Sequence, residues 1–308
     1  AGMTVRTNPA FQIVMTIKDL IERAASQFTG SDTAKLDAQL LLADVLGRDR
    51  TWLMTWNDVD VSDTDQQQFA SLVERRARGE PIAYILGFRE FWGLTLECNP
   101  STLIPRPETE LLVEKSLELG LPPDARILDL GTGTGAIALA LASERPDWRI
   151  QAVDFSADAI ALAKRNSKNL GINNVEFRQS NWFASLDPAH KFDLIVSNPP
   201  YVDPGSPYLN MGDVRFEPRS ALIAESTGLA DIEHIATNAP RFLKKDGVRV
   251  NFYSDPKFPG PGSGWLMVEH GYEQAGPVAE LFRRAGFGQI RYHNDLAGWP
   301  RITVGKLG

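Results

Sequence analysis

The chain has 308 residues, 43% of them hydrophobic and 23% charged, which is the composition of an ordinary globular protein long enough for two domains. Its net charge of -7 argues against a large nucleic-acid interface, because phosphate binding needs clustered Lys and Arg. The single cysteine, Cys98, excludes an internal disulfide and a cysteine-based metal cage, and the four histidines show no ligand spacing, so we expect no metal site. No apolar run approaches the roughly 20 residues that span a membrane. We expect a cytoplasmic protein with no membrane partner.

The N-terminal part of the sequence predicts a small helical domain over residues 15–80. Residues 1–14 lack the apolar core and cleavage site of a signal peptide, and we interpret them as an artificial remnant or a disordered arm. Beyond them, apolar residues recur with helical spacing from Ile17 to Phe28, and two further helices are predicted over 33–46 and 63–78. No strand pattern interrupts these helices.

An aromatic-rich stretch with two glycines, 81–98, predicts a β-hairpin, and we assign 81–104 as a linker between domains. The chain then reads Ile104-Pro105-Arg106-Pro107-Glu108-Thr109-Glu110. Pro107, followed by acidic residues, predicts the start of a helix. This does not explain why Arg106 lies between two prolines, so Arg106 is kept as a candidate functional residue.

The remaining residues, 105–308, alternate strand and helix patterns. A predicted strand over 126–130 leads into the glycine loop 131–135 and then into a helix, which is the opening of a doubly wound nucleotide-binding fold. The next strand ends at Asp154, whose carboxylate can accept hydrogen bonds from ribose hydroxyls. Trp182 follows a further strand and is placed to pack on an adenine ring, with ordinary core packing as the alternative.

The apolar run 192–197 predicts a buried strand that ends abruptly at Asn198-Pro199-Pro200-Tyr201, hereafter the Asn-Pro-Pro-Tyr corner. Each proline lacks a backbone N–H, so the sheet cannot continue and the strand ends in a rigid polar corner, at the edge where such sheets bind ligands. A loop over 202–220, a helix near 228–243, a strand over 265–269 and a helix near 275–285 follow. The last strands, 289–293 and 301–304, are too close for a crossover helix and predict an antiparallel hairpin.

The glycine loop alone does not identify the ligand. Gly131, Gly133 and Ala136 also satisfy the dinucleotide fingerprint, so an NAD oxidoreductase is an alternative. That alternative offers no hydride-transfer site and leaves the Asn-Pro-Pro-Tyr corner without a role. Asp129 and the antiparallel final hairpin instead favour an α/β fold of the class I S-adenosylmethionine-dependent methyltransferase type, Rossmann-like and mostly parallel, preceded by the helical domain.

Three motifs resemble those of methyltransferases that act on planar NH2 nitrogens. They are Asp129-Leu130-Gly131-Thr132-Gly133-Thr134-Gly135, Asp154 and Asn198-Pro199-Pro200-Tyr201. Together with the segments 104–110, 214–218 and 269–271 and the helical domain, they make the chain similar to the HemK/PrmC family. That family comprises the N5-glutamine methyltransferases of peptide-chain release factors. The likeness runs from Met15 to Gly308.

The resemblance implies S-adenosylmethionine as cofactor and the Gly-Gly-Gln loop of a class I release factor as substrate, with the helical domain docking that protein and no direct nucleic-acid partner. It implies that the cofactor-binding residues are Gly131, Thr132, Gly133, Thr134, Gly135, Asp154, Trp182 and Asn198. It implies that the substrate-binding residues are Asn198, Pro199, Pro200 and Tyr201, of which Asn198, Pro199 and Tyr201 are catalytic, with Arg106 and Glu217 as further candidates.

The chemistry of the corner agrees with this implication. An amide nitrogen is a poor nucleophile, so the site must orient it. We expect the Asn198 side-chain oxygen and the Pro199 carbonyl to accept the two N–H bonds of a glutamine side chain, and Tyr201 to pack on its plane. Two acceptors reject a carboxylate, so glutamate is excluded. No metal or covalent intermediate is implied.

Two features depart from the pattern of the family, and two alternative functions remain. Asn181 stands where many relatives carry an acidic residue, and 248–264 is an unusual Pro- and Gly-rich inserted loop. One alternative is an N6-adenine nucleic-acid methyltransferase, because adenine presents the same flat NH2 group. The other is a non-catalytic S-adenosylmethionine-binding adaptor.

Overall fold

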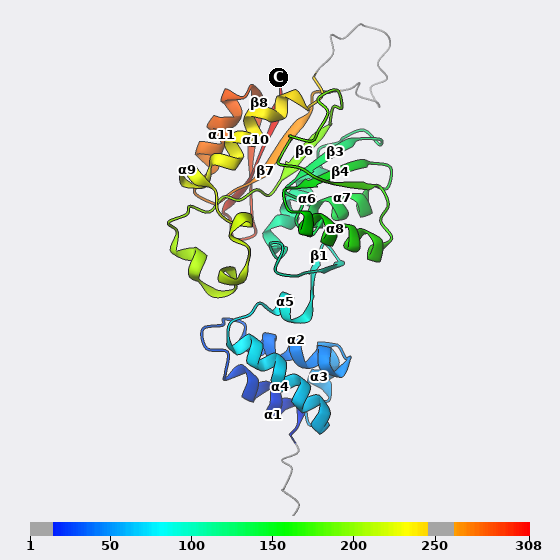
Figure 1. The fold of residues 1–308 in the computed structure, drawn as a ribbon, viewed down its shortest axis with the longest axis vertical. Coiled ribbons are helices and arrows are strands. Elements are labelled where there is room, and N and C mark those ends of the chain that lie inside the picture. The colour runs from blue at the N-terminus through cyan, green and yellow to red at the C-terminus, as the bar shows by residue number, and fades with distance from the viewer. Residues whose placement is uncertain (1–14, 246–261) are drawn as a thin grey trace, which may run out of the picture. The chain divides into compact units, whose positions relative to one another are not determined.

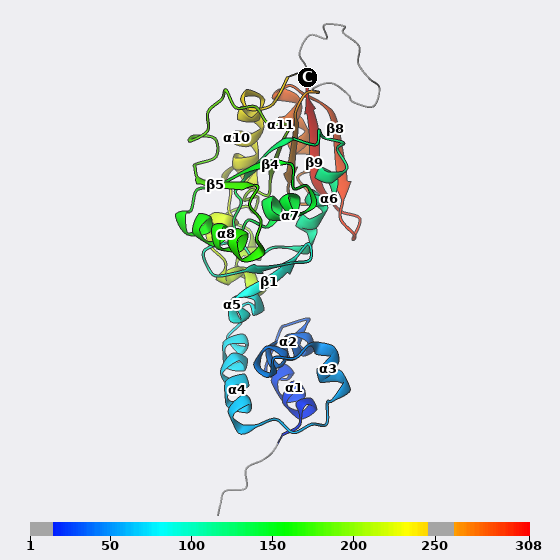
Figure 2. The ribbon, with the colours of Figure 1, turned by 90° about the vertical axis from the view of Figure 1, so that its right-hand side faces the viewer.

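The computed structural model describes residues 15–245 and 262–308, and the chain forms two compact units (Figures 1 and 2). We call them the helical unit, Ala1–Leu86, and the sheet unit, Gly87–Gly308. The N-terminal arm expected over 1–14, and most of the inserted loop, lie outside the described residues. Within the described ranges, no helix is both long and apolar enough to cross a membrane.

The helical unit contains the three predicted helices and two short ones. Thr16 caps the first helix with a capping box to Asp19, and the core is built from apolar residues such as Leu41 and Phe69. Asp49 caps a six-residue helix that the sequence pattern missed, by accepting a hydrogen bond from Trp52 N at 2.7 Å. The helices are α1 (Ile17–Ala25), α2 (Ala34–Leu46), α3 (Arg50–Thr55), α4 (Asp63–Ala77) and α5 (Ile82–Leu86).

The predicted hairpin is shorter than expected. Its strands are β1 (Phe88–Phe91) and β2 (Leu94–Glu97), whereas the residues before it form α5. The prediction of hairpin structure from residue 81 was wrong there, because the Pro81 carbonyl accepts hydrogen bonds from the N–H groups of Tyr84 and Ile85, both at 3.0 Å, and starts a helical turn.

The sheet unit is built around seven strands in the order β5-β4-β3-β6-β7-β9-β8. The first five of these pair in parallel, whereas β9 runs antiparallel to both β7 and β8. The predicted mostly parallel sheet with an antiparallel terminal hairpin is therefore confirmed. The strands are β3 (Arg126–Leu130), β4 (Arg149–Asp154), β5 (Val175–Gln179), β6 (Leu194–Ser197), β7 (Trp265–Glu269), β8 (Phe287–Asn294) and β9 (Pro300–Leu307).

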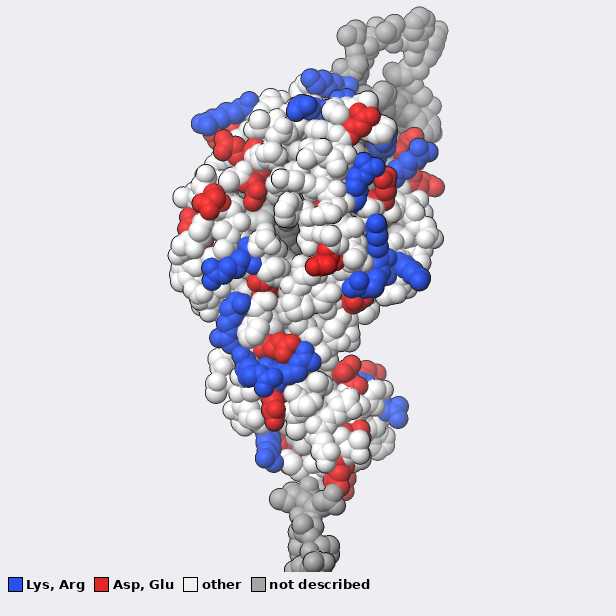
Figure 3. All heavy atoms as spheres, in the orientation of Figure 1, with Lys and Arg blue, Asp and Glu red and all other residues white. Residues whose placement is uncertain are grey.

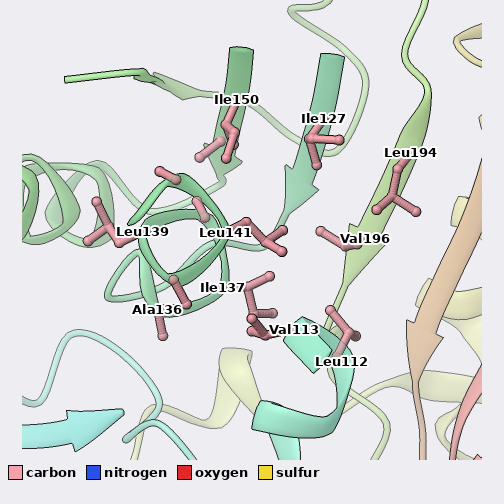
Figure 4. Packing of buried hydrophobic residues seen from close by; sticks show 14 of the residues in the cluster. Leu112, Val113, Ile127, Ala136, Ile137, Leu139, Leu141, Ile150, Leu194 and Val196 are labelled. Atoms are coloured by element: carbon pink, nitrogen blue, oxygen red, sulfur yellow. The ribbon is translucent and has the colours of Figure 1, made fainter. Parts of the chain in front are cut away.

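Helices cover both faces of this sheet, which explains why its central strands are apolar on both sides (Figure 1). Along β3, Ile127 packs on the side of α7, as Figure 4 shows, and Leu128 packs in the cluster on the opposite face. The larger helices are α6 (Glu110–Leu117), α7 (Ala136–Glu144), α8 (Ala157–Leu170), α10 (Ala230–Asn238) and α11 (Ala275–Arg284).

Two connections differ from the expected elements. The helix predicted near 228–243 is divided into α9 (Glu225–Gly228), α10 and the 3-10 turn Ala239–Arg241, which contains Pro240. The loop after the Asn-Pro-Pro-Tyr corner folds into three further 3-10 turns, Pro207–Asn210, Gly212–Phe216 and Arg219–Ala221.

The carboxyl ends of four parallel strands meet at one edge of the sheet. Leu130 at the end of β3 is paired with Val153 in β4 and with Ser197 in β6, and Ser197 is paired in turn with Val268 in β7. The connection order reverses between β3 and β6, and in open α/β sheets the crevice at such a point is where ligands bind. The glycine loop and the Asn-Pro-Pro-Tyr corner follow these two strands.

Candidate active site

A cavity of about 270 Å³ lies at this edge of the sheet. Of the expected cofactor-binding residues, all but one line it. They are Gly131, Thr132, Gly133, Thr134, Asp154, Trp182 and Asn198. Gly135 is instead the residue before α7, where an added Cβ would approach Leu139 at 3.0 Å, so its place in the fold is close packing of the helix.

The glycine loop is fixed by hydrogen bonds to the end of β4. Gly131 and Gly133 have φ values of 75° and 55°, in the left-handed region that favours glycine. The N–H of Gly133 donates to Asp154 Oδ2 at 2.9 Å, and the N–H of Ser156 donates to Asp154 Oδ1 at 2.9 Å. Each carboxylate oxygen retains a further lone pair, so Asp154 can still accept hydrogen bonds from ribose hydroxyls.

Asp129 lies beneath the loop and is completely buried. The Thr132 hydroxyl donates to Asp129 Oδ2 at 2.6 Å, while Oδ1 has no hydrogen-bond partner among the described residues. Burial, aided by the nearby charge of Asp154 and opposed by the hydrogen bond from Thr132, raises the pKa of Asp129 to about 7. Asp129 does not itself line the cavity, but it is hydrogen-bonded to Thr132, which does.

Trp182 has a left-handed backbone, with φ of 49°, which is uncommon for a bulky residue. The Ser180 hydroxyl stabilises this turn by donating to the Trp182 carbonyl at 2.8 Å and accepting from Ser185 N at 3.1 Å. The Trp182 ring lies 3.6 Å from the position that a Cβ on Gly131 would occupy, so the ring borders the glycine loop.

Asp231, near the start of α10, is a cavity residue that the sequence analysis missed. Burial raises the pKa of Asp231, whereas a hydrogen bond from the Trp182 side chain lowers it. Its connection to Trp182 carries no sequence signal, because the two residues belong to distant segments.

The Asn-Pro-Pro-Tyr corner is fixed from two sides. The Ser197 hydroxyl donates to the Leu130 carbonyl at 2.7 Å, which anchors the end of β6 to β3. Asn198 Nδ2 donates to Thr109 Oγ1 at 3.1 Å. No described residue donates a hydrogen bond to Asn198 Oδ1 or to the Pro199 carbonyl, so both acceptors remain available. Asn198 and Pro200 line the cavity, whereas Pro199 and Tyr201 do not.

Tyr201 is held by contacts to three segments. Its hydroxyl donates to Glu269 Oε1 at 3.3 Å, and its carbonyl accepts from Gln274 Nε2 at 3.0 Å. Gly228 lies so close that an added Cβ would collide with the Tyr201 carbonyl oxygen. Burial, reinforced by the charge of Glu269, raises the pKa of the Tyr201 phenol, so it remains a hydrogen-bond donor.

Glu269, at the end of β7, is 1% exposed, and its Oε2 atom has no hydrogen-bond partner among the described residues. Burial, aided by the charge of Glu108 and opposed by Thr109, Tyr201 and Arg301, raises its pKa to about 7.

The neighbouring residue, His270, is also buried, and burial lowers the pKa of its imidazole. Its Nδ1 lies 2.9 Å from the Gly271 carbonyl, so Nδ1 carries the proton and Nε2 accepts from the Thr303 hydroxyl at 2.8 Å. A neutral, fully bonded histidine of this kind joins β7 to β9.

Arg106 and Glu217 form an ion pair at 2.6 Å. Arg106 lines the cavity. Glu217 does not, and its side chain is completely buried. Burial raises the pKa of Glu217 and Arg106 opposes this rise. The two candidates from separate segments are therefore brought together, with the guanidinium on the cavity side. No group of His, Cys, Asp and Glu in the described part of the chain could hold a metal ion.

The comparisons with known proteins match both units. Residues 19–87 match the PrmC N-terminal domain, and residues 121–258 match a methyltransferase domain. A structure of a methyltransferase from Pyrococcus furiosus is 18% identical, covers 78% of this chain and 99% of that one, and has a TM-score of 0.50, a likeness in fold alone.

Full-length relatives are much closer in sequence. The release factor glutamine methyltransferase of Aliivibrio fischeri is 46% identical over 95% of this chain and 98% of its own. The protein of that name from Salmonella typhimurium is 47% identical over 95% of this chain and 99% of its own. The chain belongs to the family of release factor glutamine methyltransferases.

Proposed function

We propose that this chain transfers a methyl group from S-adenosylmethionine to the side-chain amide nitrogen, N5, of the glutamine in the Gly-Gly-Gln loop of class I peptide-chain release factors. The observation that carries the proposal is the Asn-Pro-Pro-Tyr corner at the glycine-lined cavity. Asn198 lines that cavity, and no described residue donates a hydrogen bond to Asn198 Oδ1 or to the carbonyl of the next residue, Pro199. The names of the full-length relatives support the same activity.

The residues around the cavity fit S-adenosylmethionine, which supplies a sulfonium-activated methyl group when bound. The part of the glycine loop that lines the cavity, Gly131–Thr134, would take the amino-acid part against its backbone. Beneath it, Asp129 Oδ1 is an unpaired oxygen that could accept from that part. Asp154 would accept from the ribose hydroxyls and Trp182 would border the adenine. Asn198 would lie between cofactor and substrate.

The corner then binds and orients the substrate amide. Asn198 Oδ1 and the Pro199 carbonyl accept its two N–H bonds, and Pro200 and Tyr201 bound its plane. This positioning directs the nitrogen lone pair at the methyl group, and such positioning is the main source of rate when a poor nucleophile must react. A glutamate carboxylate meets two acceptors and no donor, so it is excluded. The amide gives up a proton to water once the methyl group is attached.

Arg106 and the helical unit have supporting roles in the proposal. Arg106 presents a cation at the cavity and contacts the substrate loop, while Glu217 holds its guanidinium in place. The helical unit docks the release factor. On the face of the sheet unit drawn in Figure 3, basic and acidic side chains are interspersed, which favours a protein substrate over a phosphate backbone.

The test is transfer of a labelled methyl group from S-adenosylmethionine to three acceptors: a purified class I release factor, its Gln-to-Glu loop variant, and a nucleic-acid mixture. We expect label on the unmodified factor alone, strong loss with Asn198→Ala, and no loss with Asn173→Ala, which alters an exposed asparagine. Label on nucleic acid would show an adenine methyltransferase instead. Cofactor binding without any labelled acceptor would show an adaptor.

A further inference from the structure

Most of the large apolar side chains that are exposed on the sheet unit lie in segments next to the carboxyl edge of the sheet, where the cavity is. They are Phe155, which lines the cavity, Tyr208, Met211 and Phe216 in the loop after the corner, Tyr272 after β7, and Leu296 and Trp299 between β8 and β9. Exposed apolar residues that are scattered singly need no explanation, whereas a concentration of them marks an interaction surface.

Two of these aromatic residues are stacked on each other. The ring centroids of Tyr272 and Trp299 are 5.2 Å apart, and the Arg301 guanidinium lies over the Tyr272 ring, 5.8 Å from its centroid. Tyr272 is 47% exposed and Trp299 is 54% exposed. Leu296, in the same turn as Trp299, is completely exposed. We call Tyr272, Leu296, Trp299 and Arg301 the aromatic platform.

The turn that carries Trp299 is fixed by the carboxylate of Asp295. Its Oδ1 accepts hydrogen bonds from the N–H groups of Ala297 and Trp299, both at 2.9 Å, and its Oδ2 accepts from Arg301 Nε at 2.8 Å. The turn between β8 and β9 therefore presents its tryptophan through a defined hydrogen-bonded structure. The exposed parts of these rings remain in water, where apolar surface contributes nothing to folding.

The platform is joined to the Asn-Pro-Pro-Tyr corner by hydrogen bonds through one side chain. The N–H of Gly271 donates to Gln274 Oε1 at 2.8 Å, and Gln274 Nε2 donates to the Tyr201 carbonyl at 3.0 Å. Tyr272 belongs to the turn that Gln274 closes, since the Gln274 N–H also donates to the Gly271 carbonyl at 2.9 Å. The platform is thus continuous with the site at which the substrate amide is proposed to bind.

The size of a protein interface brings the platform within reach of a substrate bound at the corner. The corner follows β6, and β7 and β9 are the next strands of the sheet, so β9 lies about 10 Å from β6 at a strand spacing of about 5 Å. An interface of standard size covers about 800 Å² on each partner, which is a disc of about 16 Å radius. A protein whose interface is centred on the corner therefore covers the platform as well.

We propose that the aromatic platform is a docking surface for the class I release factor and receives an apolar patch on the domain that carries the Gly-Gly-Gln loop. The partner surface is apolar because the platform presents two aromatic rings and a leucine, and its one cation, Arg301, is already paired with Asp295. The inference rests on the proposed function, because it names the surface that holds the substrate of that reaction.

The test measures three quantities for each variant: kcat and KM with the release factor, the dissociation constant of the release factor, and S-adenosylmethionine affinity by calorimetry. Trp299→Ala and Tyr272→Ala should each raise the KM and the dissociation constant about tenfold, because truncation of a large aromatic at the centre of an interface has an effect of this size. The value of kcat at saturating factor and the cofactor affinity should stay within about twofold, because the platform touches no reacting atom. Trp299→Phe and Tyr272→Phe keep an aromatic ring and should stay within about threefold of the natural chain.

Leu296→Asp is the second kind of variant and serves if the aromatic truncations do not fold. Because Leu296 is completely exposed, its replacement removes no contact from the fold, yet it places a carboxylate against the apolar partner surface. We expect the KM for the release factor to rise at least about tenfold. The matched control is Asn173→Asp, which adds the same charge at an exposed residue just before β5, at the amino end of the parallel strands, and should leave the KM unchanged.

An unchanged KM in Trp299→Ala, Tyr272→Ala and Leu296→Asp, with an active natural chain, would overturn this inference and leave the proposed function intact. An equal rise in KM with Asn173→Asp would also overturn it, because the effect would then come from net charge. If the natural chain methylates no release factor, the proposed function fails and this inference fails with it.

Discussion

The ion pair between Arg106 and Glu217 allows a quantitative prediction for Arg106→Gln. The Glu217 side chain is completely buried, the Arg106 side chain is 27% exposed, and their charged atoms lie 2.6 Å apart. Removing one partner of such a pair leaves a buried charge uncompensated, which costs about 3–5 kcal/mol. Because Arg106 retains some contact with solvent, we expect the lower end, about 3 kcal/mol at pH 8.

The matched control is Arg165→Gln. Arg165 contacts Glu97 at 2.9 Å, but both side chains are more than a third exposed, and exposed pairs of this kind contribute roughly 0–1 kcal/mol. The two substitutions therefore make the same chemical change at similar distances and differ in burial.

The assay is urea denaturation. The free energy of unfolding is taken from the transition in which the protein loses its ability to bind the cofactor. Burial already raises the pKa of Glu217, and loss of Arg106 raises it further. At lower pH the carboxyl therefore takes up a proton and no longer carries an uncompensated charge. The cost of Arg106→Gln should accordingly shrink from pH 8 to pH 6, and the double variant with Glu217→Gln should recover most of it. Equal costs for Arg106→Gln and Arg165→Gln at pH 8 would refute the reasoning.

Three further predictions concern the cavity and the corner. Gly228→Ala forces a Cβ into the Tyr201 carbonyl at a φ of 81°, so it should lower stability by at least about 2 kcal/mol and reduce kcat. Gly276→Ala, in helix α11 with no atom within 4 Å, should leave stability unchanged or raise it slightly in the same denaturation assay. Trp182→Ala should weaken S-adenosylmethionine binding about tenfold by calorimetry, and Trp299→Ala, at an exposed tryptophan, should leave it unchanged; equal effects would mean that Trp182 is ordinary core. Glu269 accepts the hydroxyl of the corner residue Tyr201, and with its pKa raised to about 7 it is mostly ionised above pH 7 and mostly protonated below it. We therefore expect kcat at saturating cofactor to fall about tenfold between pH 8 and pH 6, and an identical profile in Glu269→Gln would assign the change to another group.

The sequence patterns predicted the sheet unit well because buried parallel strands and glycine turns leave local signals. The apolar strand 192–197, its proline stop and the short final hairpin are examples, and β6 and the β8–β9 pairing confirm them. Elements that depend on weak local signals were missed. The helix α3 has six residues and depends on one cap, and α5 begins where the aromatic pattern predicted a strand.

The sequence predicts that candidate site residues lie close together only where they follow a strand of the sheet. Asp154 and Asn198 come together because parallel strands end at one edge. The contacts of Asn198 with Thr109 and of Tyr201 with Glu269 join segments far apart in the chain, and no periodicity or spacing encodes them. Burial of Glu269 and its raised pKa likewise follow from packing of the whole unit.

The central claim is that the Asn-Pro-Pro-Tyr corner directs a methyl group to the amide nitrogen of one glutamine. The most direct measurement is tandem mass spectrometry of a class I release factor after incubation with this protein and S-adenosylmethionine. The account predicts the mass of one added methyl group on the glutamine side chain of the Gly-Gly-Gln loop and on no other residue, and no addition with the Asn198→Ala variant. A methyl group on any other residue of the factor, or its presence with that variant, would contradict the account.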